Sequence, residues 1–273
     1  MKLSFTTLAC PNWTLDKITE AAIKFGYDAI DFRGYTGQIR IFELKEFNDK
    51  LDETKEKIKS CGLSVSAFSS SVNACPENEE VKNNFISEIK AYTRLCDVFD
   101  TKFIRIFGGK LGNRSRLEAL KDAKKFLSEI AKIAEDNNIE IVIETHDDWT
   151  SSDNLLKLIE VAASPYINAL WDIHHPYRFC SESPAETWNK IGKYVKYTHW
   201  KDSKKIKSTD GKDSFKLCLC GEGDIPFAEI LTVLKLGGYD GYLTFEWEKQ
   251  WHPEIEEPEI ALPTFVESIR KLS

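Results

Sequence analysis

Four short apolar runs in this chain each end at a side chain that can bind a metal ion. The runs and the residues that follow them are 139–143 with Glu144, 169–171 with Asp172, 195–198 with His199, and 243–245 with Glu246. Three carboxylates gathered without a cation would raise one another's pKa values, whereas a divalent ion removes that repulsion. Oxygen-rich ligation with one imidazole favours Mn²⁺, with Mg²⁺, Co²⁺ and Zn²⁺ as alternatives. We therefore predict one divalent metal site, against the alternative of ordinary salt bridges at these positions.

Strand-like and helix-like patterns alternate along the chain and must position these residues. Apolar strand-like runs begin near residues 3, 29, 63, 103, 139, 169, 195 and 242, with amphipathic helical patterns between them. Eight such units predict a single α/β domain over residues 1–273, a (β/α)8 TIM barrel, with an open doubly wound sheet as the alternative. The active site of such a barrel lies at the C-terminal ends of its strands, where neighbouring strands are about 4.8 Å apart. Strands five to eight can therefore direct their terminal side chains onto one ion.

Local patterns predict several element boundaries. We expect a charged helix over 43–60, a strand over 63–68 that ends in a serine loop at 69–71, and a helix that begins at Pro184. Asp172 is followed by two histidines and Pro176, and this proline is expected to stop the strand because it has no N–H to donate. Arg105 lies within a strand-like run and is expected to form a salt bridge in a layer of the barrel.

Composition excludes several classes of function. The chain is 42% hydrophobic and 30% charged, which is typical of a folded globular protein, and its formal charge of −7 disfavours binding to nucleic acid or to an anionic membrane. Its seven cysteines show no dense spacing, and residues 1–7 resemble a strand more than a signal peptide. We therefore expect reduced thiols and a cytoplasmic location, and a homo-oligomer remains open.

Motifs along nearly the whole chain carry a family resemblance. The motifs are FGYDAID at 25–31, IETH at 143–146, WDIHHP at 171–176, THWKD at 198–202, GEGDI at 221–225 and FEW at 245–247. On these motifs the chain resembles the xylose isomerase-like TIM barrel superfamily of sugar and sugar phosphate isomerases and epimerases, which also includes enzymes like endonuclease IV. The resemblance implies the same fold and a metal-dependent enzyme of carbohydrate metabolism.

The resemblance also implies roles for particular residues. In the ketose 3-epimerases of this superfamily the residues matching Glu144, Asp172, His199 and Glu246 bind a metal such as Mn²⁺, and the two glutamates act as acid and base. A bound metal would polarise the substrate carbonyl and stabilise the enediolate formed when the neighbouring C–H loses its proton. His175 matches a histidine that contacts substrate. Those epimerases also have a glutamate and an arginine at positions occupied here by Thr150 and Lys205, so the resemblance does not establish ketohexose 3-epimerisation and leaves both substrate and reaction open.

Three further side chains are candidates for substrate binding. Lys201 has the strand parity of His199 and His146 that of Glu144, so both are expected to face the site, with solvated rim positions as the alternative. Trp13 is expected in a loop on the catalytic side, where its ring could stack on a sugar.

The leading hypothesis is an isomerase or epimerase of a small sugar, sugar phosphate or cyclitol. A dehydratase of the inosose or dehydroshikimate type is the alternative, because the same metal and carboxylates can expel a β-hydroxyl group. A phosphodiesterase like endonuclease IV is disfavoured because that activity uses a histidine-rich three-zinc site and this chain has five histidines. A sugar-binding barrel without catalysis is the remaining hypothesis.

Overall fold

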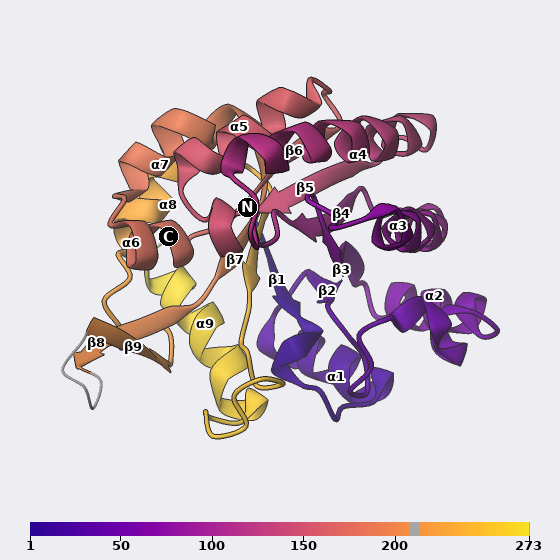
Figure 1. Cartoon of the computed structure of the whole chain (residues 1–273). Helices are drawn as coiled ribbons and strands as arrows, with labels where there is room; N and C mark the ends of the chain where they lie inside the picture. The colour runs from indigo at the N-terminus through magenta and orange to yellow at the C-terminus, as the bar shows by residue number, and fades with distance from the viewer. Residues whose placement is uncertain (208–212, 273) are drawn as a thin grey trace.

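Eight parallel strands close into a barrel in the computed structural model, which describes residues 1–207 and 213–272. Around the barrel the strand order is β1, β10, β7, β6, β5, β4, β3, β2 (Figure 1). The strands span Lys2–Thr6 (β1), Ala29–Phe32 (β2), Ser64–Asn73 (β3), Phe103–Phe107 (β4), Glu140–Glu144 (β5), Ile167–Asp172 (β6), Val195–Trp200 (β7) and Tyr242–Phe245 (β10). The predicted (β/α)8 TIM barrel is confirmed.

The helices surround the barrel, and all except the short α6 contribute apolar side chains to the core around the strands (Figure 1). They span Leu15–Phe25 (α1), Leu51–Ser60 (α2), Glu79–Phe99 (α3), Arg116–Asp136 (α4), Ser152–Ala162 (α5), His175–Cys180 (α6), Pro184–Ile191 (α7), Phe227–Leu236 (α8) and Pro258–Leu272 (α9). Local sequence sets their ends: Ser115 and Glu118 form a capping box at the start of α4, and Gly26 ends α1 in a left-handed conformation.

A layer of apolar side chains fills the barrel directly below the candidate ligands. Val142, Leu170 and Tyr197 pack together inside the barrel, and each precedes a candidate ligand on its strand by two residues. Because alternate residues of a strand point to the same face, Glu144, Asp172 and His199 must also point inward. The register sets Asp172 beside His199 across β6 and β7, so the two side chains leave the layer at the same height.

Two predicted boundaries were wrong. The helix expected over 43–60 ends at Ser60 as predicted but begins only at Leu51, and two short 3-10 turns, Ile41–Glu43 and Lys45–Phe47, precede it. Charged residues alone could not distinguish these turns from a helix. The third strand does not end before the serines but continues through Ser69–Ser71 to Asn73, because Ser70 bonds the backbone of β4 and keeps the chain extended.

Two elements above the barrel were not predicted. Helix α6 begins at His175, directly after β6, where we expected a loop up to Pro184. The strands Asp202–Lys207 (β8) and Asp213–Cys218 (β9) form an antiparallel hairpin that projects from the barrel beside α6 (Figure 1). Both elements follow strands that end in candidate ligands, so they lie over the site.

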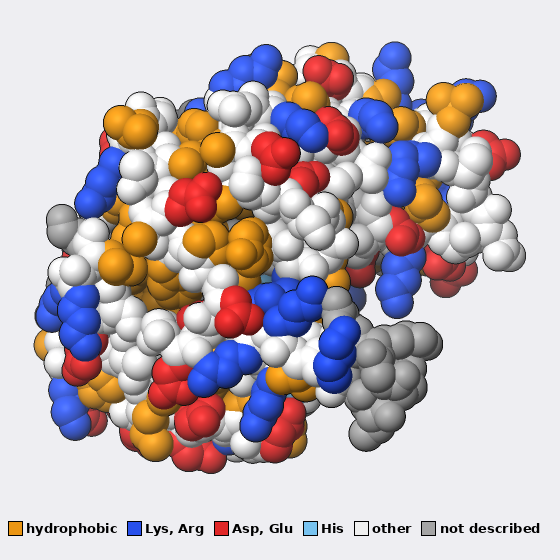
Figure 2. Space-filling view, turned by 90° about the vertical axis from the view of Figure 1, so that its left-hand side faces the viewer, with side chains coloured by type: hydrophobic (Ala, Val, Ile, Leu, Met, Phe, Trp, Pro, Cys, Tyr) orange, Lys and Arg blue, Asp and Glu red, His pale blue; other side chains and the backbone are white. Residues whose placement is uncertain are grey.

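Acidic and basic side chains are interspersed on the face drawn in Figure 2, so neither sign of charge dominates that face. Among the described helices, none combines the length and the apolar character that crossing a membrane requires.

Candidate active site

The four predicted ligands converge at the C-terminal end of the barrel. One side-chain nitrogen or oxygen of each of Glu144, Asp172, His199 and Glu246 lies within 4.8 Å of those of the other three. All four side chains are buried, with exposed fractions of 5% or less. Four ligand atoms gathered this closely, three of them from carboxylates, match the coordination that a single divalent ion requires.

His199 presents one ring nitrogen to this cluster and uses the other to hold its orientation. Its Nδ1 lies 3.5 Å from Glu144 Oε1 and 3.3 Å from Glu246 Oε1, and Nε2 lies 3.2 Å from Asp31 Oδ2. A carboxylate behind a ligating imidazole fixes the tautomer that leaves the other nitrogen free to bind a metal. Asp31 was missed in the sequence, although an acidic residue in the otherwise apolar strand β2 was an available signal.

Arg105 pairs with Glu144 inside the barrel, as predicted. Its Nε lies 3.2 Å from Glu144 Oε2, its Nη1 donates to the carbonyl of Ser70, and its guanidinium lies 3.9 Å from the centre of the Phe107 ring. Burial works to raise the pKa of Glu144, but the Arg105 charge outweighs it and the pKa is lowered to about 2. Glu144 is therefore a carboxylate at neutral pH.

The turn after β6 holds Asp172 in place through backbone hydrogen bonds. Asp172 Oδ1 accepts from the N–H groups of His174 and His175, at 2.8 and 3.1 Å, so helix α6 begins where it can orient this carboxylate. Burial, opposed by Lys201 and reinforced by Glu144 and Glu246, raises the pKa of Asp172 to about 6. Of the three carboxyl groups, only Asp172 has a raised pKa; those of Glu144 and Glu246 are lowered because Arg105, Lys201 and His199 face them.

Lys201 lies inside the site, where it is paired with three carboxylates. Its Nζ lies 3.0 Å from Asp172 Oδ2 and 2.6 Å from both Glu246 Oε2 and Glu248 Oε1. Burial disfavours the ammonium, but these neighbouring carboxylates hold the pKa of Lys201 well above its usual value. The lysine faces the site as its strand parity predicted.

Three ligand atoms of the cluster fit a bound cation. Glu144 Oε2, Asp172 Oδ2 and His199 Nδ1 are buried and make no hydrogen bond within residues 1–207 and 213–272, although the two carboxylate oxygens lie in the ion pairs with Arg105 and Lys201. Buried polar atoms are normally satisfied, and these atoms are of the kinds that Mn²⁺, Mg²⁺, Co²⁺ and Zn²⁺ bind. The residues present therefore fit a divalent ion, although their chemistry does not select one metal.

His175 and His146 lie next to the cluster on the wall of a cavity. The two rings are 4.7 Å apart in an edge-to-face arrangement, and His175 Nδ1 lies 3.0 Å from the carbonyl oxygen of Thr145. His174, which had no predicted role, shares a hydrogen bond of 2.9 Å with Ser203 on the hairpin. Burial lowers the pKa of His174 to about 2, so it stays neutral.

Asp202 connects the two sequence motifs on either side of the hairpin. Its carboxylate accepts hydrogen bonds from the backbone N–H groups of Ser203, Gly221, Gly223 and Ile225. A Cβ atom on Gly223 would lie 1.9 Å from Asp202 Oδ1, so only glycine allows this approach. The HWKD and GEGD motifs therefore form one structural unit that anchors the hairpin over the site.

Three positions that the sequence analysis singled out lie outside the cluster. Trp13 lines a separate cavity, none of whose lining residues belongs to the cluster, and Lys17 lies over its ring. Thr150 donates its hydroxyl to the carbonyl of Asp147 and lines the cavity beside His175. Lys205 is on β8, where its backbone N–H donates to Asp224.

Comparisons with known proteins agree with this architecture. A model of the xylose isomerase-like TIM barrel family matches residues 19–270. The chain is similar to inosose dehydratase from Clostridium tetani (strain Massachusetts / E88), with 27% identity over 144 residues, which is 48% of each protein. It is also similar to fructoselysine 3-epimerase from Escherichia coli O157:H7, with 20% identity over 100% of this chain and 98% of that enzyme. The matched stretch thus spans about half of the dehydratase.

A solved structure of the IolI protein with a bound zinc atom has the same fold. It superposes with a TM-score of 0.82 and 19% identity over 100% of this chain and 98% of that protein. The curated proteins similar to this chain therefore include an epimerase and a dehydratase, and a protein of the same fold has been solved with a zinc atom bound.

Proposed function

The chain belongs to the xylose isomerase-like TIM barrel family, and within this family we propose that it is a metal-dependent isomerase or epimerase of a small polyhydroxy carbonyl compound. The observation that carries the proposal is the pair of buried glutamates, Glu144 and Glu246, at one cluster of four ligand atoms. Glu144, Asp172, His199 and Glu246 would hold the ion. Mn²⁺ is our first choice because three of the four ligands are carboxylates.

A divalent ion held there would polarise the substrate carbonyl and stabilise negative charge on its oxygen. Glu246 and Glu144 are then the groups that remove and return the proton on the adjacent carbon. Both lie beside His199 Nδ1, and both have pKa values below the ordinary range despite burial, because Lys201 and His199 face Glu246 while Arg105 faces Glu144. Each glutamate therefore begins as a carboxylate that can accept a proton. To invert the carbon, one glutamate removes the proton while the other first takes a proton from solvent and then delivers it to the opposite face. To isomerise the sugar, the first glutamate returns its proton to the neighbouring carbon, and the hydroxyl proton moves to the former carbonyl oxygen.

Dehydration is the second candidate, and the position of Lys201 favours it. Its ammonium lies 2.6 Å from Glu246 Oε2, so a proton donor for a departing hydroxyl group stands next to a carboxylate that can take the C–H proton. The similarity to inosose dehydratase adds support over the 144 residues that match.

Proton NMR in D₂O tests both reactions together. Protein loaded with Mn²⁺, and protein treated with a chelator, are incubated with D-tagatose, fructoselysine, an inosose and the 6-phosphate of D-tagatose, and the metal is removed before detection. We expect loss of a C–H signal next to a carbonyl only with metal-loaded protein. A stereoisomer or a shifted carbonyl identifies an epimerase or isomerase, and a product lacking water identifies a dehydratase. Metal-loaded protein that exchanges no C–H in any compound would overturn the proposal.

A further inference from the structure

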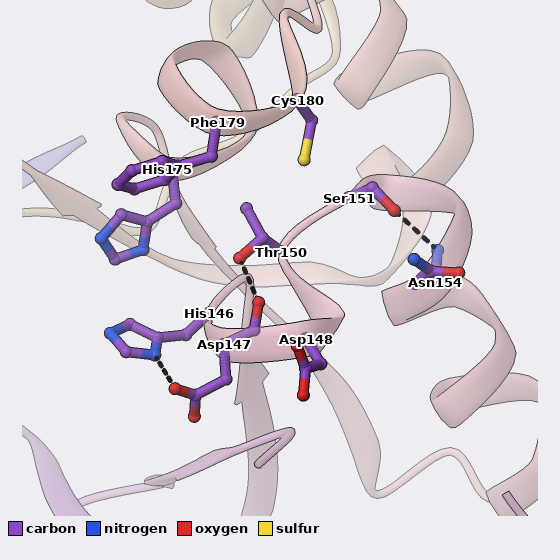
Figure 3. Close-up of a pocket in the computed structure, with 9 residues that line it drawn as sticks. All are labelled: His146, Asp147, Asp148, Thr150, Ser151, Asn154, His175, Phe179 and Cys180. Atoms are coloured by element: carbon purple, nitrogen blue, oxygen red, sulfur yellow. Dashed lines mark hydrogen bonds and ion pairs between the residues drawn. The ribbon is translucent and has the colours of Figure 1, made fainter. Parts of the chain in front are cut away.

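A cavity of about 560 Å³ opens beside the candidate metal cluster, between α5, α6 and the short 3-10 turn Asp147–Trp149 (Figure 3). It adjoins a second cavity of about 330 Å³ that lies under the hairpin and includes Lys201, because His146 and His175 line both. A molecule with its reactive carbon at the cluster can therefore extend past His175 into the larger cavity.

His175 lines both cavities and carries a hydrogen-bond acceptor. Its Nδ1 lies 3.0 Å from the carbonyl of Thr145, which can only accept, so Nδ1 carries the proton and Nε2 has the lone pair. The residue is 8% exposed, and no partner of Nε2 is found among the residues described. Figure 3 shows the His175 and His146 rings on one wall, with Thr150 between them and Ser151. An acceptor without a partner in the described part of the chain, on a residue that lines both cavities, calls for a donor from a ligand that occupies them.

Two carboxylates add to this acceptor character. Asp147 is held in a left-handed conformation (φ 52°), which is strained for a residue other than glycine, and its Oδ1 lies 3.2 Å from His146 Nδ1. Asp148 accepts a hydrogen bond from the backbone N–H of Leu111. The lining residues of this cavity include two aspartates but no lysine or arginine.

We propose, building on the function proposed above, that this cavity binds the unreactive part of the substrate and selects a hydroxyl-rich chain without a phosphate group. Hydroxyl groups can donate to His175 Nε2 and to the two aspartates. A phosphate brings acceptor oxygens and negative charge, so it would meet the two aspartates in a cavity with no lysine or arginine among its described lining residues. The basic side chains nearest these aspartates are already engaged, because His146 pairs with Asp147 and Arg116 donates to the backbone carbonyl of Asp148. Lys201 does not change this, because its ammonium is already shared among three carboxylates.

Cys180 provides a direct test because it lines the cavity and is exposed. Cys61 is partly exposed and the other five cysteines are buried, so a Cys61→Ser background leaves Cys180 as the thiol most open to alkylation.

The rate of alkylation of the Mn²⁺-loaded protein by iodoacetamide is followed by mass spectrometry. D-Tagatose or D-allulose at about four times its dissociation constant should slow the reaction about fivefold, since protection scales with one plus the ligand concentration over that constant. D-Tagatose 6-phosphate and inorganic phosphate should leave the rate nearly unchanged. Equal protection by the phosphate ester, or no protection by either free sugar, would overturn the proposal.

A double variant, Asp147→Asn with Asp148→Asn, tests the charge argument. Asparagine tolerates a left-handed backbone and keeps an acceptor for Leu111, while the two negative charges are lost. Discrimination is the dissociation constant of D-tagatose 6-phosphate divided by that of D-tagatose. In the double variant this ratio should fall by about tenfold, corresponding to about 1.4 kcal/mol. Asp153→Asn is the matched control, because Asp153 is on α5 but pairs with Lys190 outside the cavity, and it should leave discrimination unchanged. Unchanged discrimination in the double variant would contradict the account.

The outcome separates this proposal from the proposed function. Protection of Cys180 reports binding alone, whereas C–H exchange in D₂O reports catalysis. Free sugars that protect Cys180 without exchanging a C–H would support the cavity as a binding site and contradict the enzyme proposal. Exchange of a sugar that leaves Cys180 unprotected would do the reverse.

Discussion

The two halves of the barrel make different contributions to the candidate site. Strands β5, β6, β7 and β10 are consecutive around the barrel and end at the four candidate ligands. The opposite arc supplies Asp31 from β2, which holds His199, and Arg105 from β4, which holds Glu144. One half therefore carries the groups that would touch a metal, and the other carries the charges that orient them. The comparison teaches that a site confined to four strands still depends on the whole closed barrel.

The largest effect is expected on the ligand-bearing side. Glu246→Gln keeps the shape of the side chain but removes a base and a ligand charge, so C–H exchange by Mn²⁺-loaded protein should fall by about 10³-fold. Glu248→Gln is the matched control, because Glu248 also contacts Lys201 at 2.6 Å but does not belong to the ligand cluster. It should retain most of the exchange rate. Equal losses in the two variants would show that the pairing with Lys201 matters and that Glu246 has no special role.

A smaller effect is expected on the supporting side. Asp31→Asn leaves all four ligands in place but weakens the hold on His199 Nε2, so Mn²⁺ affinity should fall by about 10- to 100-fold, measured by isothermal titration. Asp28→Asn is the control, because Asp28 precedes the same strand and bonds the backbone of Leu3 away from the site. If Asp31→Asn binds Mn²⁺ as tightly as the unchanged protein, Asp31 does not orient His199 for metal binding, and the supporting role assigned to this half of the barrel is wrong.

The pH dependence of stability tests whether His174 is neutral in the folded protein. Burial depresses the pKa of His174 to about 2 in the folded protein. The unfolded chain protonates this histidine near pH 6.5 while the folded protein does not, so stability is lost as the pH falls below 6.5. Both the unchanged protein and the His174→Gln variant are treated with a chelator. Between pH 7 and pH 5, the free energy of unfolding of the unchanged protein should fall by about 2 kcal/mol more than that of the variant. Urea unfolding at the two pH values measures this, and identical losses would show that His174 is protonated when folded.

The smallest effect is expected at the hairpin, which belongs to neither arc. Asp202→Asn places an amide against backbone N–H donors and loosens the base of the hairpin, so KM should rise by roughly tenfold while kcat changes little. Steady-state kinetics on whichever sugar exchanges in D₂O measures this split. Asp240→Asn, an exposed carboxylate elsewhere, is the control. A fall in kcat with an unchanged KM would place Asp202 in the chemistry and contradict a positioning role.

The sequence predicted the barrel and the convergence of the ligands because both follow from periodicity. Val142, Leu170 and Tyr197 alternate with Glu144, Asp172 and His199, and strand ends in a parallel barrel share one face. The direction of the Arg105 side chain also follows from this alternation, which is why its ion pair could be anticipated.

The missed features depend on contacts between distant segments. The bond between His199 and Asp31 joins residues 168 positions apart, and no local pattern reports it. Strands β8 and β9 are anchored at their base by hydrogen bonds from Gly221 and Gly223 to Asp202. The charged sequence of the two strands does not by itself indicate an antiparallel pair. Helix α6 begins with the backbone N–H groups that Asp172 accepts, an arrangement that only the folded site supplies.

The most direct test of the central claim counts the metal ions that the cluster holds. Mn²⁺ is titrated into chelator-treated protein, and the free ion is followed by electron paramagnetic resonance. The account predicts one tight Mn²⁺ site per chain, and predicts that this site is lost in Asp172→Asn, since the amide lacks the charge that the ligand set requires. Absence of tight binding by the unchanged protein, or an equally tight site in Asp172→Asn, would contradict it.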